Sequence, residues 1–298
     1  MPISHILLAL LVVVIWGINF LFVKLGLNEI SPLLLLAVRF ILASIPAIFF
    51  IKPPAVPFRM VALYGLVMFA LQFGLLFFGM SLGMPAGMTS IIMQVQVFFS
   101  MFFAAIWLKD IPDIWQVLGA LVAFSGIALV GMHFDGDITL LGFVCILAGA
   151  ATWGIGNLIT KKIKNVNMIS LVIWGSLVAA VPTTIAALIL EGPQSIVTSY
   201  HQLSWVGIVS LLYIVYASTW VGYGVWNWLI GHHPVGLVVP FTLLVPIVAV
   251  LSSVIVTHEE FQSWQIIAGL LVMGGLAINL LGAKLFLPIL RKKISQES

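Results

Sequence analysis

The chain has 298 residues, of which 62% are hydrophobic and only 7% are charged, with a formal net charge of +3 and a mean hydropathy of +1.24. A soluble domain usually carries roughly 25% charged residues, so this composition excludes a water-soluble globular protein. In lipid, only helices and closed barrels satisfy their own backbone polar groups. The apolar runs are too long and continuous for barrel strands, so we predict an all-α integral membrane protein.

Ten transmembrane helices are predicted, because a spanning helix needs about 20 mostly apolar residues. In chain order they cover residues 6–27, 32–51, 60–80, 85–108, 112–132, 139–161, 168–190, 203–230, 234–257 and 262–286. Turn-forming segments such as KPPAVP at 52–57 and GHHP at 231–234 separate most of them. The connections are too short to hold a soluble domain.

The distribution of Lys and Arg predicts the orientation, because basic connections stay on the cytoplasmic side. With a cytoplasmic N-terminus, ten helices return the C-terminus to the cytoplasm as well. The external connections are then residues 28–31, 81–84, 133–138, 191–202 and 258–261, which contain no Lys or Arg. Topology leaves two basic residues unexplained within the helices, Lys24 and Arg39.

The second half of the chain repeats features of the first. WGINFLFVK at 16–24 matches WGIGNLITK at 153–161, and residues 85–130 align without gaps on 234–279. Apolar helices resemble each other by composition alone, but two matches in the same order favour a true repeat. Each unit has five helices, and because five is an odd number the second copy enters the membrane from the opposite side, as in many secondary transporters.

These boundaries predict two inverted five-helix repeats, at residues 1–135 and 136–287, followed by a basic cytoplasmic tail at 288–298. Glycines along the spans 112–132 and 262–286 predict close helix packing. That packing lies either within the fold or at the seam of a homodimer.

Several stretches carry a resemblance to a known family. They are LLVVVIWGINF at 10–20, PAIFF at 46–50, GMPAG at 83–87, MQVQVFF at 93–99, SLVIW at 170–174, VGYGVW at 221–226 and LLVP at 243–246. The chain resembles the EamA family of the drug/metabolite transporter superfamily, most closely its bacterial cysteine and O-acetylserine exporter branch. It departs from that branch in WNWLIGHHP at 226–234, which is richer in Trp and His.

The resemblance implies ten helices, two cytoplasmic termini, a central cavity between the halves and residence in the bacterial inner membrane. It also implies export of small amino-acid-like metabolites by alternating access. The alternative within the superfamily is export of drugs, aromatic amino acids or other hydrophobic metabolites, which the Trp-rich segment favours.

Two tryptophans are the first candidates for a substrate site. Trp16 and Trp153 lie near the middle of their spans, away from the interfacial belt where Trp is common. Helical spacing places Phe20 and Lys24 on the face of Trp16, and Asn157 on the face of Trp153. Both Trp residues face the cavity or, alternatively, pack against neighbouring helices.

Polar residues at membrane depth must find a partner helix, a cavity or substrate. Asn19, Asn157 and Asn227 are of this kind. Gln94 and Gln96 are two residues apart and point to different faces, so at most one faces the cavity. The other substrate-binding candidates are Gln72, Trp174, Tyr223 and Trp226.

The positions of the charged residues narrow the class of possible substrates. All nine carboxylates fall in connections, helix ends or the tail, whereas Lys24 and Arg39 lie roughly 6 Å and 10 Å below the outer surface at 1.5 Å per residue. Either cation can hold a substrate carboxylate. Alternatively, Lys24 snorkels or pairs with Glu29, and Arg39 bridges helix ends. Two cations favour a substrate with a single carboxylate. A zwitterion whose amine rests on Trp faces therefore fits best.

The sequence therefore predicts a secondary transporter of a zwitterionic amino-acid-like metabolite, in contact with membrane lipid and not with nucleic acid. It has no phosphate-binding GxxxxGK[ST] motif, and we expect no cofactor. An intramembrane enzyme would need paired carboxylates, a metal set or an activated nucleophile at membrane depth, and the sequence offers no catalytic or metal-binding residues. A non-transporting receptor or assembly protein is disfavoured by the short connections.

The topology can be tested with reporter fusions. A reporter at Thr198 is expected to be external and one at Asn165 cytoplasmic, since residues 191–202 lack Lys and Arg whereas Lys162 and Lys164 flank the other connection. Both reporters on the same side would contradict the ten-span topology.

Overall fold

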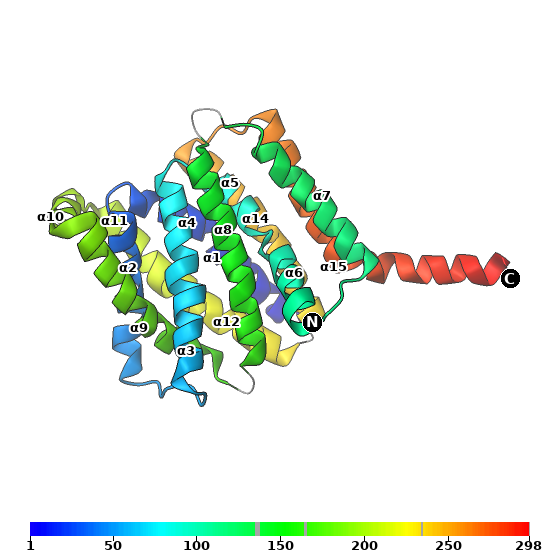
Figure 1. Ribbon diagram of the computed structural model, residues 1–298, viewed down its shortest axis with the longest axis horizontal. Helices are drawn as coiled ribbons and strands as arrows, with labels where there is room; N and C mark the ends of the chain where they lie inside the picture. Colours follow the sequence, from blue (N-terminus) through cyan, green and yellow to red (C-terminus); the bar gives the residue numbers. More distant parts are fainter. Residues whose placement is uncertain (135–137, 164–165, 234, 298) are drawn as a thin grey trace.

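The computed structural model describes residues 1–134, 138–163, 166–233 and 235–297; the side chains of Asn227, Ile230, Val235, Gly236 and residues 283–297 lie outside the described part. The described residues form an all-helical bundle, and none of them lies in a strand (Figure 1). The predicted all-α architecture is confirmed.

The first half contains α1 (Ile3–Leu27), α2 (Pro32–Ile48), α3 (Phe58–Tyr64), the π-helix η1 (Gly65–Leu71), α4 (Gln72–Ser81), α5 (Ala86–Met93), α6 (Gln96–Leu108) and α7 (Ile114–Val130). The second half contains α8 (Leu140–Lys162), α9 (Met168–Ala186), the π-helix η2 (Ala187–Glu191), α10 (Gly192–Gln202), α11 (Trp205–Leu212), the π-helix η3 (Tyr213–Gly222), α12 (Tyr223–His232), α13 (Val235–Val238), the 3-10 helix η4 (Val239–Leu244), α14 (Val245–Thr257) and α15 (Ser263–Glu297). The backbone of α15 continues through the segment that the sequence assigns to a tail.

Eight helical stretches in the described chain are long and apolar enough to cross a membrane. The apolar helices α2 and α7 have 17 residues each, which is the lower end of the spanning range. The membrane architecture therefore agrees with the sequence, while the number of ten spans and their orientation remain predictions.

One predicted connection is a helix instead. Residues 191–202 were expected to form an external loop because EGP at 191–193 resembles a helix stop, but Gly192–Gln202 forms α10. Pro193 lies in the first turn of α10, where its missing N–H costs no hydrogen bond and its fixed φ favours a helix. The prediction was wrong because proline ends one helix and begins the next.

Carboxylates at the helix ends join the two halves of the chain. Glu191 accepts hydrogen bonds from the Leu33 and Leu34 N–H groups at the start of α2, at 2.8 and 3.1 Å. Glu259 accepts from the Ala86 N–H at the start of α5, at 3.0 Å. A carboxylate satisfies otherwise unpaired N–H groups and interacts favourably with the helix dipole there.

Glu29 makes a similar contact just before α11. It accepts bonds from the Ser204 N–H (2.8 Å) and hydroxyl (2.6 Å). The Ser204 hydroxyl lowers the pKa of Glu29, since it stabilises the carboxylate. The acidic residues of three connections are thus used to fasten helices of opposite halves to each other.

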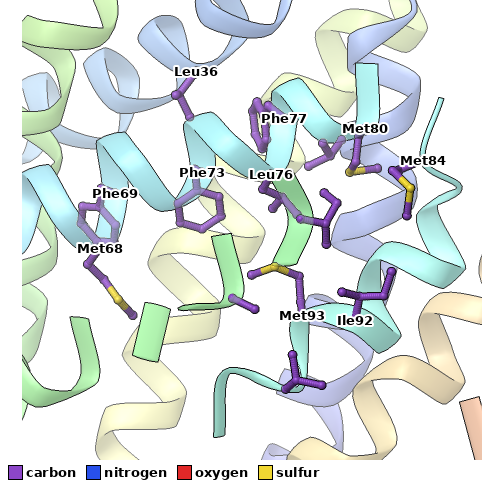
Figure 2. Close-up of a cluster of buried hydrophobic side chains, with 14 of the residues drawn as sticks. Leu36, Met68, Phe69, Phe73, Leu76, Phe77, Met80, Met84, Ile92 and Met93 are labelled. Carbon is purple, nitrogen blue, oxygen red and sulfur yellow. The ribbon is translucent and has the colours of Figure 1, made fainter. Parts of the chain in front are cut away.

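Aromatic and methionine side chains fill the core beside α2. Figure 2 shows Phe69, Phe73 and Phe77 along the continuous helix formed by η1 and α4, with Leu36 of α2 and Met93 of α5 in the same cluster. The ring centroids of consecutive Phe residues in this row lie 6.3 and 6.1 Å apart. This row forms one wall of the site described below.

Glycine backbones pack α7 directly on α15 at one edge of the bundle (Figure 1). A Cβ added at Gly119 would lie 2.5 Å from the Gly275 carbonyl oxygen. Close backbone approach of this kind stabilises helix pairs in lipid. Gly119 and Gly275 are therefore used for packing within the chain, and the homodimer stays a prediction.

This contact predicts a packing defect. Gly119→Leu should destabilise the protein by about 1 to 3 kcal/mol, because the new side chain must separate two backbones. The matched control is Gly274→Leu, since a Cβ at Gly274 meets nothing within 4 Å. Thermal unfolding in detergent, followed by Trp fluorescence, compares them. Equal midpoints for the two variants would contradict the tight α7–α15 contact.

Candidate functional site

Arg39 is the charged side chain buried deepest among the described residues. It extends from α2 and is 1% exposed. Its Nη2 donates to the Thr219 hydroxyl at 3.4 Å, and its Cζ lies 3.9 Å from the centroid of the Phe73 ring. Nε and Nη1 have no hydrogen-bond partner within the described protein. The guanidinium is therefore held by one weak hydrogen bond and a ring face, with two donor groups left over.

π-Helical segments lie next to or within the two helices that contact this cation. Phe73 lies in α4, two residues after the end of η1, and Thr219 lies inside η3, where its hydroxyl donates to the Ile214 carbonyl five residues earlier at 2.9 Å. The two segments lie in the third helix of each predicted repeat. Wide helical turns often occur at functional sites.

Trp16 reaches the same part of η3 from α1. Its indole N–H donates to the Ser218 carbonyl at 3.2 Å, next to the residue that contacts Arg39. Its ring lies 5.4 Å from Tyr223 and 5.3 Å from Trp226. A Cβ at Gly222 would collide with the indole, so this glycine allows Trp16 to dock against η3. Trp16, Arg39 and Tyr223 are thus brought together.

Tyr223 connects the aromatic group with the helix that contacts the cation. It is partly buried at the start of α12, four residues after Thr219, which accepts the hydrogen bond from Arg39. The predicted candidate Asn227 follows on the same helix, but its side chain lies outside the described residues.

Interrupted helices of the two halves meet close to the centre. The α5–α6 helix breaks at Gln94 and Val95, and the corresponding helix of the second half contains the 3-10 segment η4. The Gln94 amide donates to the Thr242 carbonyl of η4 at 3.0 Å. The same carbonyl also accepts from the Val245 N–H, so the Gln94 amide adds a second hydrogen bond that joins the two interrupted helices.

The other glutamine contacts a different helix. The Asn157 amide of α8 donates to Gln96 Oε1 at 2.7 Å and to Ser100 Oγ at 2.9 Å. Gln94 and Gln96 do point to different neighbours, and each forms a contact between helices. For Asn157 and Gln96, the alternative of helix–helix hydrogen bonding accounts for the polar groups.

The remaining candidates are placed as follows. Trp174 donates its indole N–H to the Ile51 carbonyl at 3.1 Å, and Phe20 and Trp153 pack, partly buried, on the main core. Gln72 is 2% exposed at the start of α4. Asn19 is 7% exposed, and its Oδ1 has no hydrogen-bond partner in the described chain.

The two repeat-related lysines differ in their surroundings. Lys161 pairs with Asp110 at 3.1 Å with both side chains more than half exposed, so the pair contributes little stability. Lys24 is partly buried, and no ion pair to it occurs within the described residues. Glu29, the alternative partner of Lys24, bonds Ser204 instead.

An apolar cavity of about 240 Å³ lies between α2, α9 and the η3–α12 helix. One of its lining residues, Thr219, accepts the hydrogen bond from Arg39, and another, Tyr223, contacts Trp16. Sequence reasoning missed Thr219 and Phe73 as site residues, because one Thr and one of 20 Phe residues carry no distinguishing pattern. No group of three or more potential metal-ligating side chains occurs in the described part of the chain.

Known proteins are similar in sequence to this chain over nearly its whole length. The EamA-like transporter family matches residues 3–132 and 140–281. The chain belongs to this family. A protein of Escherichia coli K12 named "Probable amino-acid metabolite efflux pump" is 38% identical over 283 residues, covering 93% of this chain and 95% of that protein. A protein of the same name from Salmonella typhimurium is 38% identical over 281 residues, covering 92% and 94%.

A solved structure titled "Crystal structure of protein" has the same fold. Its TM-score is 0.62 at 18% identity, and the match covers 96% of this chain and all of that one. This EamA-family chain is thus a multi-pass membrane protein of a transporter family, as its sequence predicts.

Proposed function

We propose that this EamA-family protein exports small amino-acid-like metabolites with a carboxylate, of the cysteine and O-acetylserine class, from the bacterial cytoplasm by alternating access. The observation that carries the proposal is the buried Arg39 guanidinium, which has no counter-ion among the described residues. Arg39 binds the substrate carboxylate through its uncommitted N–H groups.

The charge balance supports this role. A cation buried in a membrane bundle costs several kcal/mol unless an anion or hydrogen bonds compensate it. The carboxylates of the described residues lie at helix ends or in connections, where Glu29, Glu191 and Glu259 are already used as helix contacts. A substrate carboxylate supplies the missing negative charge, and Arg can bind it in a bidentate fork.

The aromatic residues next to Arg39 suit the other end of a zwitterion. The Trp16 ring lies 5.4 Å from that of Tyr223 and 5.3 Å from that of Trp226, and aromatic ring faces attract a substrate ammonium group. The amine then lies near Trp16 and the carboxylate at Arg39.

The transport mechanism rests on two inverted repeats, at residues 1–135 and 136–287, with both termini and the tail 288–298 in the cytoplasm. The two matched ranges, 3–132 and 140–281, support this division. So do the π-helices in the third helix of each half and the interrupted helices that meet at Gln94 and Thr242. Discontinuous helices at a repeat interface are typical of transporter substrate sites.

Two observations bear on the choice of substrate. The names of the Escherichia coli and Salmonella relatives support an amino-acid metabolite, and the family resemblance supports cysteine and O-acetylserine. The apolar cavity beside Arg39 favours the second candidate function, export of aromatic amino acids, drugs or other hydrophobic metabolites.

Arg39→Met provides the main test. It should lower cysteine export from proteoliposomes by about tenfold to a few hundredfold through loss of charge-assisted hydrogen bonds. It should also raise the unfolding midpoint of the empty protein, because an apolar side chain has no charge to desolvate.

Arg39→Lys is the matched control, because it keeps the charge and loses the fork; it should retain intermediate transport. If Arg39→Met exports cysteine at the normal rate and unfolds at a lower temperature, Arg39 is a structural tie and the proposal is wrong.

Lys24 and Lys161 form a second matched pair. Lys24→Gln should lower transport about five- to a hundredfold, equivalent to about 1 to 3 kcal/mol, if Lys24 guides the carboxylate through the outer half of the path. Lys161→Gln should change the rate little, because its exposed partner Asp110 lies outside that path. Equal rates for both variants at equal membrane abundance would leave Lys24 with a snorkelling role only.

A further inference from the structure

Two histidines join the ends of α1 and α12 that the predicted topology places at the cytoplasmic surface. His5 belongs to the first turn of α1, and its Nδ1 lies 2.6 Å from Nε2 of His233, the residue that follows α12. The His5 ring also meets the Trp228 ring edge to face, with centroids 5.0 Å apart. Both imidazoles are only partly buried, so protons can reach them from the aqueous side.

Contacts between α1 and α12 continue from this pair to the proposed substrate site. Helical spacing places His5, Ala9 and Trp16 on one face of α1. Ala9 packs with Leu229 and Trp226 in a small apolar cluster that is separate from the main core. The Trp226 ring also lies beside Trp16, which is about 16 Å from His5 at 1.5 Å per residue. The two helices are therefore joined from the histidine pair up to the aromatic residues of the site.

The hydrogen bond between the two imidazoles depends on their protonation. One of the facing nitrogens must carry a proton and the other must accept it. When both rings are charged, both nitrogens carry protons, so the hydrogen bond is lost and the like charges repel each other. The contact is thus sensitive to a single proton in the pH range where histidine titrates.

The groups around the pair do not favour a second proton. The ionisable groups that act on His233 are His5, the Met1 α-amino group and His232, and all of them are basic. The helices α9, α13, η4 and α14, which pack on α1 or α12, contain no ionisable residue. Partial burial first, and then these neighbouring positive charges, lower the pKa of His233.

From this arrangement we infer that the His5–His233 pair is a proton-sensitive latch. It closes the substrate site toward the cytoplasm while the two rings share one proton, and it opens when the pair takes up a second. The inference rests on the proposed transport function and adds control by cytoplasmic pH.

The direction of the pH effect follows from the lowered pKa of His233. The closed contact binds fewer protons than the open one, so it is fully stable above the ordinary histidine pKa of about 6.5. It weakens as the pH falls below that value. An acidified cytoplasm therefore opens the latch, and a neutral one keeps it closed.

Cysteine uptake into inside-out vesicles tests the latch, because the cytoplasmic face of the protein then lies outside. With the same pH on both sides, wild-type uptake should rise about three- to tenfold between pH 7.5 and 5.5. His233→Gln should stay within about twofold over this range, since an amide can bond His5 but does not titrate. His232→Gln is the matched control. Its imidazole bonds the Trp228 carbonyl of its own helix at 2.8 Å, so the wild-type pH profile should persist.

Thermal unfolding of the purified protein in detergent is a second measurement, and it does not depend on transport. Between pH 7.5 and 5.5, the wild-type midpoint should fall about 2 to 4 °C further than that of His233→Gln. His5→Gln removes the other ring and should behave like His233→Gln, so a folding defect in one variant can be recognised from the other.

The latch is refuted if wild-type uptake does not change with pH, or if its pH profile persists in both His5→Gln and His233→Gln. Equal falls of the midpoint in all three proteins would refute it as well. Vesicles that take up no cysteine at any pH would instead contradict the proposed function, and the unfolding comparison would then decide about the latch alone.

Discussion

A membrane interior contains no water to solvate an isolated charge, and the arrangement around Arg39 follows from this constraint. The guanidinium is 1% exposed and is supported within the described chain by the Phe73 ring and the Thr219 hydroxyl. Neither partner carries a negative charge. The cost of burying the cation is therefore offset only in part, and the site is most stable when an anion joins it. In this way the fold can favour a substrate carboxylate, because no carboxylate of the described residues pairs with Arg39.

Most other buried polar side chains of the described residues are paired, whereas the charged group of Arg39 is paired only in part. Carboxylates at the helix ends bond N–H groups of the opposite half, as Glu191 and Glu259 do, and Trp174 bonds a carbonyl after α2. These contacts leave the interior with few uncommitted donors. Among the described residues, the buried side-chain atoms without a hydrogen-bond partner are Nε and Nη1 of Arg39, Oδ1 of Asn19 and the hydroxyls of Thr89 and Ser210, and only those of Arg39 belong to a charged group.

Much of the architecture could be predicted because hydropathy and basic residues report directly on the membrane. The same reasoning identified Arg39 and Trp16 as candidates, since each is unusual at its depth. It could not find Thr219, Phe73 or the cavity, because π-helical turns and packing gaps depend on contacts between distant segments. It also misassigned residues 191–202, where a single proline is compatible with both a loop and a helix start.

Binding of cysteine and its amide, cysteinamide, to the purified protein in detergent tests the central claim most directly. The two ligands have the same side chain, and a neutral amide replaces the carboxylate that Arg39 is proposed to hold. Titration calorimetry on the wild-type protein should give a Kd for cysteine at least about tenfold lower than for cysteinamide, and Arg39→Met should remove that difference. Equal affinities in the wild-type protein, or an unchanged preference in Arg39→Met, would contradict a carboxylate site at Arg39.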